Sequence, residues 1–119
     1  MSEREDIDFL RDIEESMERI ARYTRGMEYD NFFEDDKTQD AVIRNMEIMG
    51  EATKALSEKF RNEYAELPWK KLAMTRDKLI HHYFGVNTDI VWDIARSEIP
   101  RLLPIIESIL QNSNLSEGG

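Results

Sequence analysis

The sequence of 119 residues has no cysteine and is poor in histidine, proline and glycine, with two, three and five of each. The lack of cysteine excludes a disulfide framework and thiolate chemistry, and it fits a reducing compartment such as the cytoplasm. No apolar run approaches the roughly 18 residues that a membrane span requires, and the acidic N-terminus has no apolar signal core. We therefore expect a soluble, unprocessed cytoplasmic protein without a membrane partner.

Basic charge is also scarce, with 16 basic against 25 acidic residues and a net charge of −9. This balance opposes non-specific attachment to nucleic acid. The distribution is uneven, because residues 1–40 hold fourteen acidic and six basic residues, whereas residues 69–83 hold four basic residues and one acidic residue. The basic stretch is compatible with a bound polyanion or with a solvated helix face, and the acidic surface could serve a basic partner.

Apolar residues recur at steps of three and four in the first part of the chain, which is the spacing of one helix face. Ser2 and Glu5 have the spacing of a capping box at its start, and we expect the helix to end near Gly26. Residues 28–36 interrupt the pattern and predict a loop anchored by an aromatic residue. The buried stripe is expected to comprise Ile7, Leu10, Ile13, Met17, Ile20, Thr24 and Met27.

A second helical pattern runs from Lys37 through Phe60 and is apolar on two sides, so this helix needs two neighbours. Gly50 lies inside it, where glycine costs about 1 kcal/mol relative to alanine. A close approach by another helix would compensate for this cost, and simple tolerance is the alternative.

Pro68 is well placed as the first residue of a third helix, because its missing N–H would be unpaired there. Gly85 is expected to stop that helix. Asn87 or Thr88 can then cap the next one.

Pro100 and Pro104 lie within the last apolar pattern and should kink or split that helix, since each removes a backbone donor. Residues 111–119 are small and polar and predict a frayed tail. No strand alternation is visible. We therefore predict an all-α fold, an up-and-down helical bundle of four to five helices with no β-sheet, in one domain of residues 1–110.

Both histidines of the chain lie beside Arg76 in the third helix. Histidine exchanges protons near neutral pH, and arginine presents donors to phosphate oxygens. His81 would act as general base or acid on a ribose 2′-hydroxyl or leaving oxygen, and Arg76 would stabilise the charge at phosphorus. Asp77 could orient His81, and His82 and Lys78 are candidate supporting residues. Ordinary structural hydrogen bonding is the alternative for the histidines.

Helical spacing makes this site incomplete on one continuous helix. Arg76 and Tyr83 share a face, but Arg76 and His81 lie roughly 140° apart. A helix irregularity near His81 or a second copy packed across a two-fold axis would complete the site. Adjacent histidines diverge by about 100° and are poor metal co-ligands, so we expect no metal. Gly-rich phosphate loops are absent from the sequence, and we expect no cofactor.

The spacing Arg-x-x-x-x-His-x-Tyr, at Arg76, His81 and Tyr83, resembles the signature of HEPN-domain proteins of the HepT kind. These are the toxin half of prokaryotic toxin–antitoxin pairs that join a HEPN protein to a minimal nucleotidyltransferase. The similarity covers about residues 33–104 and includes Asp40 to Asn45, Ile48 to Ala52, Pro68, Trp69, Gly85 and Trp92.

The resemblance implies a HEPN-like helical bundle, a homodimer with facing motifs, and metal-independent endoribonuclease activity that uses Arg76 and His81 on an RNA substrate. It also implies that a cognate nucleotidyltransferase antitoxin attaches AMP to Tyr83; a half-buried helix aromatic is the alternative for this residue. Two further hypotheses remain for the protein. One is a non-catalytic helical binding module or subunit partnering a nucleotidyltransferase, and the other is a nucleotide-binding domain.

Overall fold

The computed structural model describes residues 2–81 and 87–118, with side chains described for residues 6–75, 77 and 87–112. These residues form seven α-helices and one π-helical turn, and no β-strand occurs among them. The predicted all-α fold is therefore confirmed. Within the same residues, no helix combines the length and the apolar character that crossing a membrane demands.

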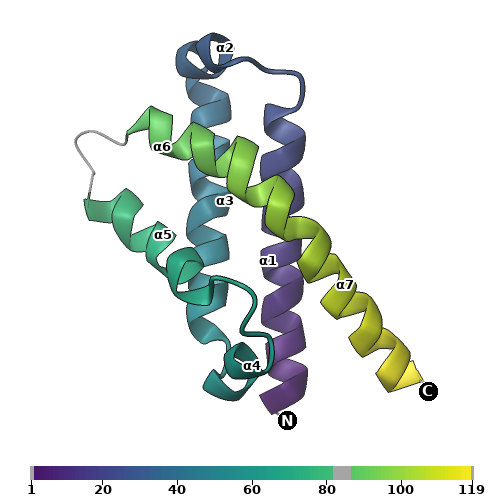
Figure 1. The fold of residues 1–119 in the computed structure, drawn as a ribbon. Helices are drawn as coiled ribbons and strands as arrows, with labels where there is room; N and C mark the ends of the chain where they lie inside the picture. Colours follow the sequence, from purple (N-terminus) through teal and green to yellow (C-terminus); the bar gives the residue numbers. More distant parts are fainter. Residues whose placement is uncertain (1, 82–86, 119) are drawn as a thin grey trace.

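Four longer helices build the bundle: α1 (Ser2–Thr24), α3 (Asp36–Ala55), α5 (Trp69–His81) and α7 (Ile99–Gly118). They run alternately up and down, which confirms the predicted topology (Figure 1). Helix α3 packs against both α1 and α5, as its two apolar sides predicted, and α7 packs against α1. Gly50 is buried within α3.

The core side of α1 is the apolar stripe read from the sequence. Its side chains at Leu10, Ile13, Met17 and Ile20 are fully buried, and Thr24 is buried at the last position. Gly26 follows the helix with a φ of +77°, a left-handed conformation that favours glycine, so the predicted stop is confirmed.

Residues 28–36 are not a loop, because they contain the short helix α2 (Tyr29–Glu34). Glu28 and Asn31 cap its start reciprocally: each side chain accepts from the backbone N–H of the other. Phe32 is fully buried, so the predicted aromatic anchor is present, while Phe33 points outward and is 57% exposed. A six-residue helix is too short to give a readable period, which is why the sequence suggested a loop.

The second predicted helix is also divided. Helix α3 ends at Ala55, Leu56 is extended, and Ser57 caps the short helix α4 (Glu58–Glu63) by accepting from Phe60 N. Asp6 of α1 holds this corner, since its carboxylate accepts from the backbone N–H and the hydroxyl of Ser57 at 2.8 and 2.7 Å. The helix that the sequence predicted as continuous is therefore divided at Leu56 and Ser57, where Asp6 of α1 accepts from Ser57.

Asn87 caps helix α6 (Thr88–Asp93) by accepting from the backbone N–H groups of Asp89 and Ile90, as predicted. Pro68 lies one residue before α5, and its carbonyl accepts from Leu72 N at 3.0 Å. The predicted stop at Gly85 lies outside the described residues.

A π-helical turn, η1 (Ile94–Glu98), joins α6 to α7, with Ile99 N donating to Ile94 O. This wide turn lies directly before Pro100, whose ring would crowd the preceding turn of a regular helix. The predicted irregularity therefore occurs before Pro100, whereas Pro104 is accommodated inside α7. Helix α7 continues to Gly118, beyond the predicted domain limit at residue 110.

Candidate functional site

Helix α5 carries Arg76 and His81 of the predicted motif, and its first turn is anchored to the corner formed by α4. Trp69 is buried, donates its indole N–H to Tyr64 O at 2.9 Å, and lies 6.0 Å from the Phe60 ring between centroids. Leu72 and Thr75 are buried on the following turns, so this face packs inward. The start of the motif helix is therefore fixed by aromatic packing and a hydrogen bond.

The motif residues Arg76 and His81 lie on one uninterrupted α-helical stretch. No irregularity separates them, so the two positions remain roughly 140° apart around the helix axis. The side chains of Arg76, Lys78 and His81, and all of His82 and Tyr83, lie outside the described residues. The roles expected of these five residues stay predictions.

Asp77 has an ionic contact that the sequence did not predict. Its carboxylate accepts from Lys54 Nζ at 2.8 Å, and this ion pair joins α5 to α3. Both side chains are partly exposed, at 42% and 38%, so water screens the pair and it contributes little to stability. The proposed orienting contact from Asp77 to His81 remains a prediction.

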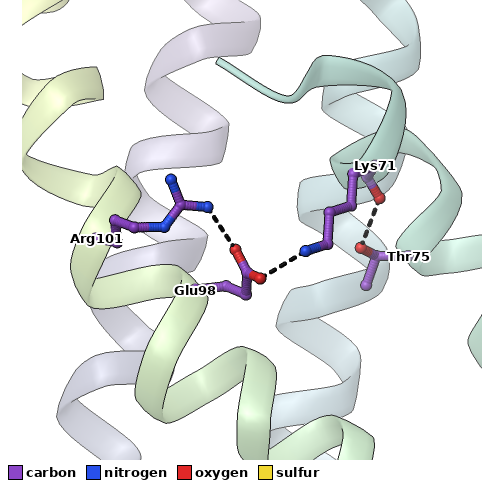
Figure 2. Close-up of polar contacts among 4 residues, drawn as sticks. All are labelled: Lys71, Thr75, Glu98 and Arg101. Atoms are coloured by element: carbon purple, nitrogen blue, oxygen red, sulfur yellow. Dashed lines mark hydrogen bonds and ion pairs between the residues drawn. The ribbon is translucent and has the colours of Figure 1, made fainter. Parts of the chain in front are cut away.

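A second ionic contact, a cluster of three charged residues, joins α5 to η1 and α7. Figure 2 shows Glu98 of η1 between Lys71 of α5, at 2.5 Å, and Arg101 of α7, at 2.8 Å. The hydrogen bonds from Lys71, and then from Arg101, lower the pKa of the Glu98 carboxyl below its ordinary value. Thr75 completes the local network by donating its hydroxyl to Lys71 O at 3.1 Å. Part of the predicted basic stretch is therefore neutralised by an acid from the π-helical turn.

The described surface also has a groove of about 500 Å³ between α1 and α3. It is lined by mixed charges and small apolar groups, namely Phe9, Asp12, Arg44, Glu47, Ile48, Glu51, Ala52 and Ala55. None of these is a predicted site residue, so the groove does not belong to the motif.

Comparison with known proteins identifies the family. The family described as "Ribonuclease HepT-like" matches residues 13–109, which include the whole motif. The chain therefore belongs to the HepT-like ribonuclease family, as the resemblance implied.

Two relatives have sequences similar over most of their length. The chain is 50% identical over 104 residues to "Putative RNase MJ0127" of Methanocaldococcus jannaschii, covering 87% of this chain and 86% of the relative. It is 45% identical over 95 residues to "Probable ribonuclease HepT" of Thermococcus cleftensis, covering 80% and 86% of the two chains. No solved structure matches.

Sequence reasoning missed the ionic partners of the motif helix. Glu98 and Arg101 have the spacing of a helical ion pair, a signal that was available. The pairs of Lys71 with Glu98 and of Lys54 with Asp77 join separate helices, and no local pattern predicts them.

Proposed function

We propose that this protein is a metal-independent endoribonuclease that cleaves RNA through attack of a ribose 2′-hydroxyl. The observation that carries the proposal is the family match across residues 13–109, which contains Arg76, His81 and Tyr83 at the signature spacing. The names of the two relatives, both given as RNases, support the same substrate class.

The chemistry needs one proton acceptor and one cation. His81 takes the proton of the 2′-hydroxyl as its oxygen attacks phosphorus, and the bond to the 5′-oxygen breaks. The leaving oxygen takes up a proton from solvent, which yields a 2′,3′-cyclic phosphate and a 5′-hydroxyl. Arg76 stabilises the extra negative charge at phosphorus with its planar donors.

The active species is proposed to be a homodimer. Because α5 is regular from Arg76 to His81, one helix directs the two positions to different sides. A two-fold axis beside α5 would bring the arginine of one copy toward the histidine of the other. In such a composite site the arginine and the histidine come from different copies, so the two residues do not need to share one face of a helix.

We also propose that the protein is the toxin of a toxin–antitoxin pair and that a nucleotidyltransferase silences it by attaching AMP to Tyr83. Tyr83 lies seven residues after Arg76, which places both on one face if the helix continues. Added AMP would bring bulk and a negative phosphate to that face and would compete with RNA phosphate for Arg76.

The test is an RNA digestion series with purified protein and the single variants Arg76→Ala, His81→Ala and His82→Ala. We expect loss of the arginine to slow cleavage by about 10²–10³-fold and loss of His81 by about 10²–10⁴-fold. His82→Ala is the comparison at the adjacent position, where a supporting role predicts a smaller loss of cleavage than at His81. Intact RNA with the wild-type dimer would rule out the nuclease, and equal cleavage by all four proteins would rule out the roles assigned to Arg76 and His81.

The alternative is a non-catalytic module or subunit that binds a nucleotidyltransferase, and the net charge of −9 favours it. In that case all three variants would bind the partner as the wild type does and would have the same biological effect. Expression without the partner separates the two functions, since only the toxin arrests growth and only its arrest depends on Arg76 and His81.

A further inference from the structure

Helices α2 and α6 meet toward the end of the bundle that carries α2, at the top of Figure 1. Aromatic side chains of these two helices lie close together there. Tyr29 lies 5.9 Å from Phe33 and 6.1 Å from Trp92 between ring centroids, and Trp92 packs on the buried Phe32 at 5.1 Å. We call Tyr29, Phe33 and Trp92 the aromatic platform. Phe33 is its most exposed member, at 57%.

Hydrogen bonds at both ends of α2 tie the platform to α3 and α6. Gln39 of α3 donates its amide to Phe32 O and Phe33 O at 2.8 and 2.7 Å. Tyr29 donates its hydroxyl to Asp89 of α6. The backbone that presents Phe33 is therefore tied to α3, which reduces the ordering that a bound partner would have to impose on it.

The two segments that carry the platform are rich in acidic residues. Residues 25–37 and 87–96 together hold seven acidic and three basic residues, a net charge of −4. One of the three, Arg96, is already engaged, since it lies 5.2 Å from the Trp92 ring centroid and donates to Thr24 O at 3.2 Å. Asp30, Glu34 and Asp93 are exposed and adjoin the platform residues in the sequence of α2 and α6.

We propose that the aromatic platform is a docking surface for a protein partner that presents an arginine- or lysine-rich segment with one apolar anchor. Aromatic faces attract cations, and the exposed acidic residues of the same two helices add complementary charge. The same charge argues against the two other occupants: RNA would meet carboxylates, and a second copy would place acid against acid. The proposal does not rest on the nuclease activity, because no residue of the platform belongs to the motif.

The test uses a fluorescein-labelled synthetic peptide of arginines around a single leucine, with binding followed by fluorescence anisotropy. A peptide with glycine in place of leucine and one with glutamates in place of arginines serve as ligand controls. The protein variants are Phe33→Ser, the double change Asp30→Asn with Glu34→Gln, and Met74→Ser. Met74 of α5 is the matched control, because it is 44% exposed and lies outside the platform.

We expect the arginine–leucine peptide to bind the wild type, more weakly as salt rises, and about tenfold less tightly to Phe33→Ser and to the double variant. Met74→Ser should bind as the wild type does, and the glutamate peptide should not bind. Three results would each overturn the proposal: no binding of the peptide to the wild type, equal binding to Phe33→Ser, or RNA binding that depends on Phe33 while peptide binding does not.

Discussion

Lys71 of α5 and Glu98 of the π-helical turn are joined by an ion pair of 2.5 Å, so the helix that carries Arg76 and His81 is tied to the turn that precedes α7. Arg101 binds the other carboxylate oxygen, and the side chain of Glu98 is only 20% exposed. The π-helical turn thus has a role in positioning, because it brings an acid to the predicted basic stretch.

Replacing this acid tests the ionic cluster. Glu98→Gln should lower the free energy of unfolding by about 1 kcal/mol or less at pH 7, since Lys71 and Arg101 are well exposed. The pKa of Glu98 is lowered in the fold, so its stabilisation is present above the ordinary glutamate pKa and is lost as pH falls through the folded value. Urea unfolding across pH 3–7 should therefore show that the difference in unfolding free energy between the wild type and Glu98→Gln shrinks below about pH 4.3.

The control for this prediction is Glu47→Gln, which breaks an exposed ion pair of 3.6 Å with Arg44 inside α3. It should change the unfolding free energy less than Glu98→Gln does. A difference for Glu98→Gln that is constant over the whole pH range would contradict the lowered pKa.

Asp6 should be a larger contributor to stability, because it is 4% exposed and accepts two hydrogen bonds from Ser57. Asp6→Ala leaves the backbone N–H of Ser57 without this acceptor and should cost about 1–3 kcal/mol in urea unfolding. Asp8→Ala removes the same charge from an exposed position of α1 and should cost distinctly less. Equal losses for the two variants would show that the corner of α4 does not depend on Asp6.

Glu14 is expected to destabilise the fold when it is ionised. Burial raises its pKa above the ordinary value, and repulsion from Glu18 and Glu107 adds to this effect against the attraction of Arg11. Glu14→Gln should therefore stabilise the protein by about 0.5 kcal/mol at pH 7, measured by thermal unfolding. A glutamate whose pKa is raised in the fold stabilises the protein at low pH, and this stabilisation is lost as the pH rises through the folded pKa. The gain in stability of Glu14→Gln over the wild type should therefore vanish below about pH 4.

The matched substitution for that prediction is Glu66→Gln, which removes one charge at an exposed position between α4 and α5. It should leave the melting temperature nearly unchanged. A gain from Glu66→Gln as large as that from Glu14→Gln would assign the effect to net charge alone.

The sequence predicted the long elements well because each gives several turns of a regular period. The buried stripe of α1 and the two packed sides of α3 were both readable in this way. Helices α2 and α4 were missed, since six residues give less than two turns and their positions depend on Gln39 and Asp6 from other helices. Local spacing cannot predict such contacts.

The candidate site was also predictable from the sequence only in part. The motif spacing was visible in sequence, and the regular geometry of α5 supports the conclusion that Arg76 and His81 do not converge on one helix. The ionic partners Lys54 and Glu98 could not be predicted, because they come from residues 23 and 27 positions away.

The most direct test of the proposed composite site is a heterodimer of an Arg76→Ala chain and a His81→Ala chain, purified through a different tag on each. If each site takes its arginine from one copy and its histidine from the other, one of the two sites is intact. The heterodimer should then cleave RNA at about half the wild-type rate, while each mutant homodimer is inactive. A heterodimer as inactive as both homodimers would contradict the composite site.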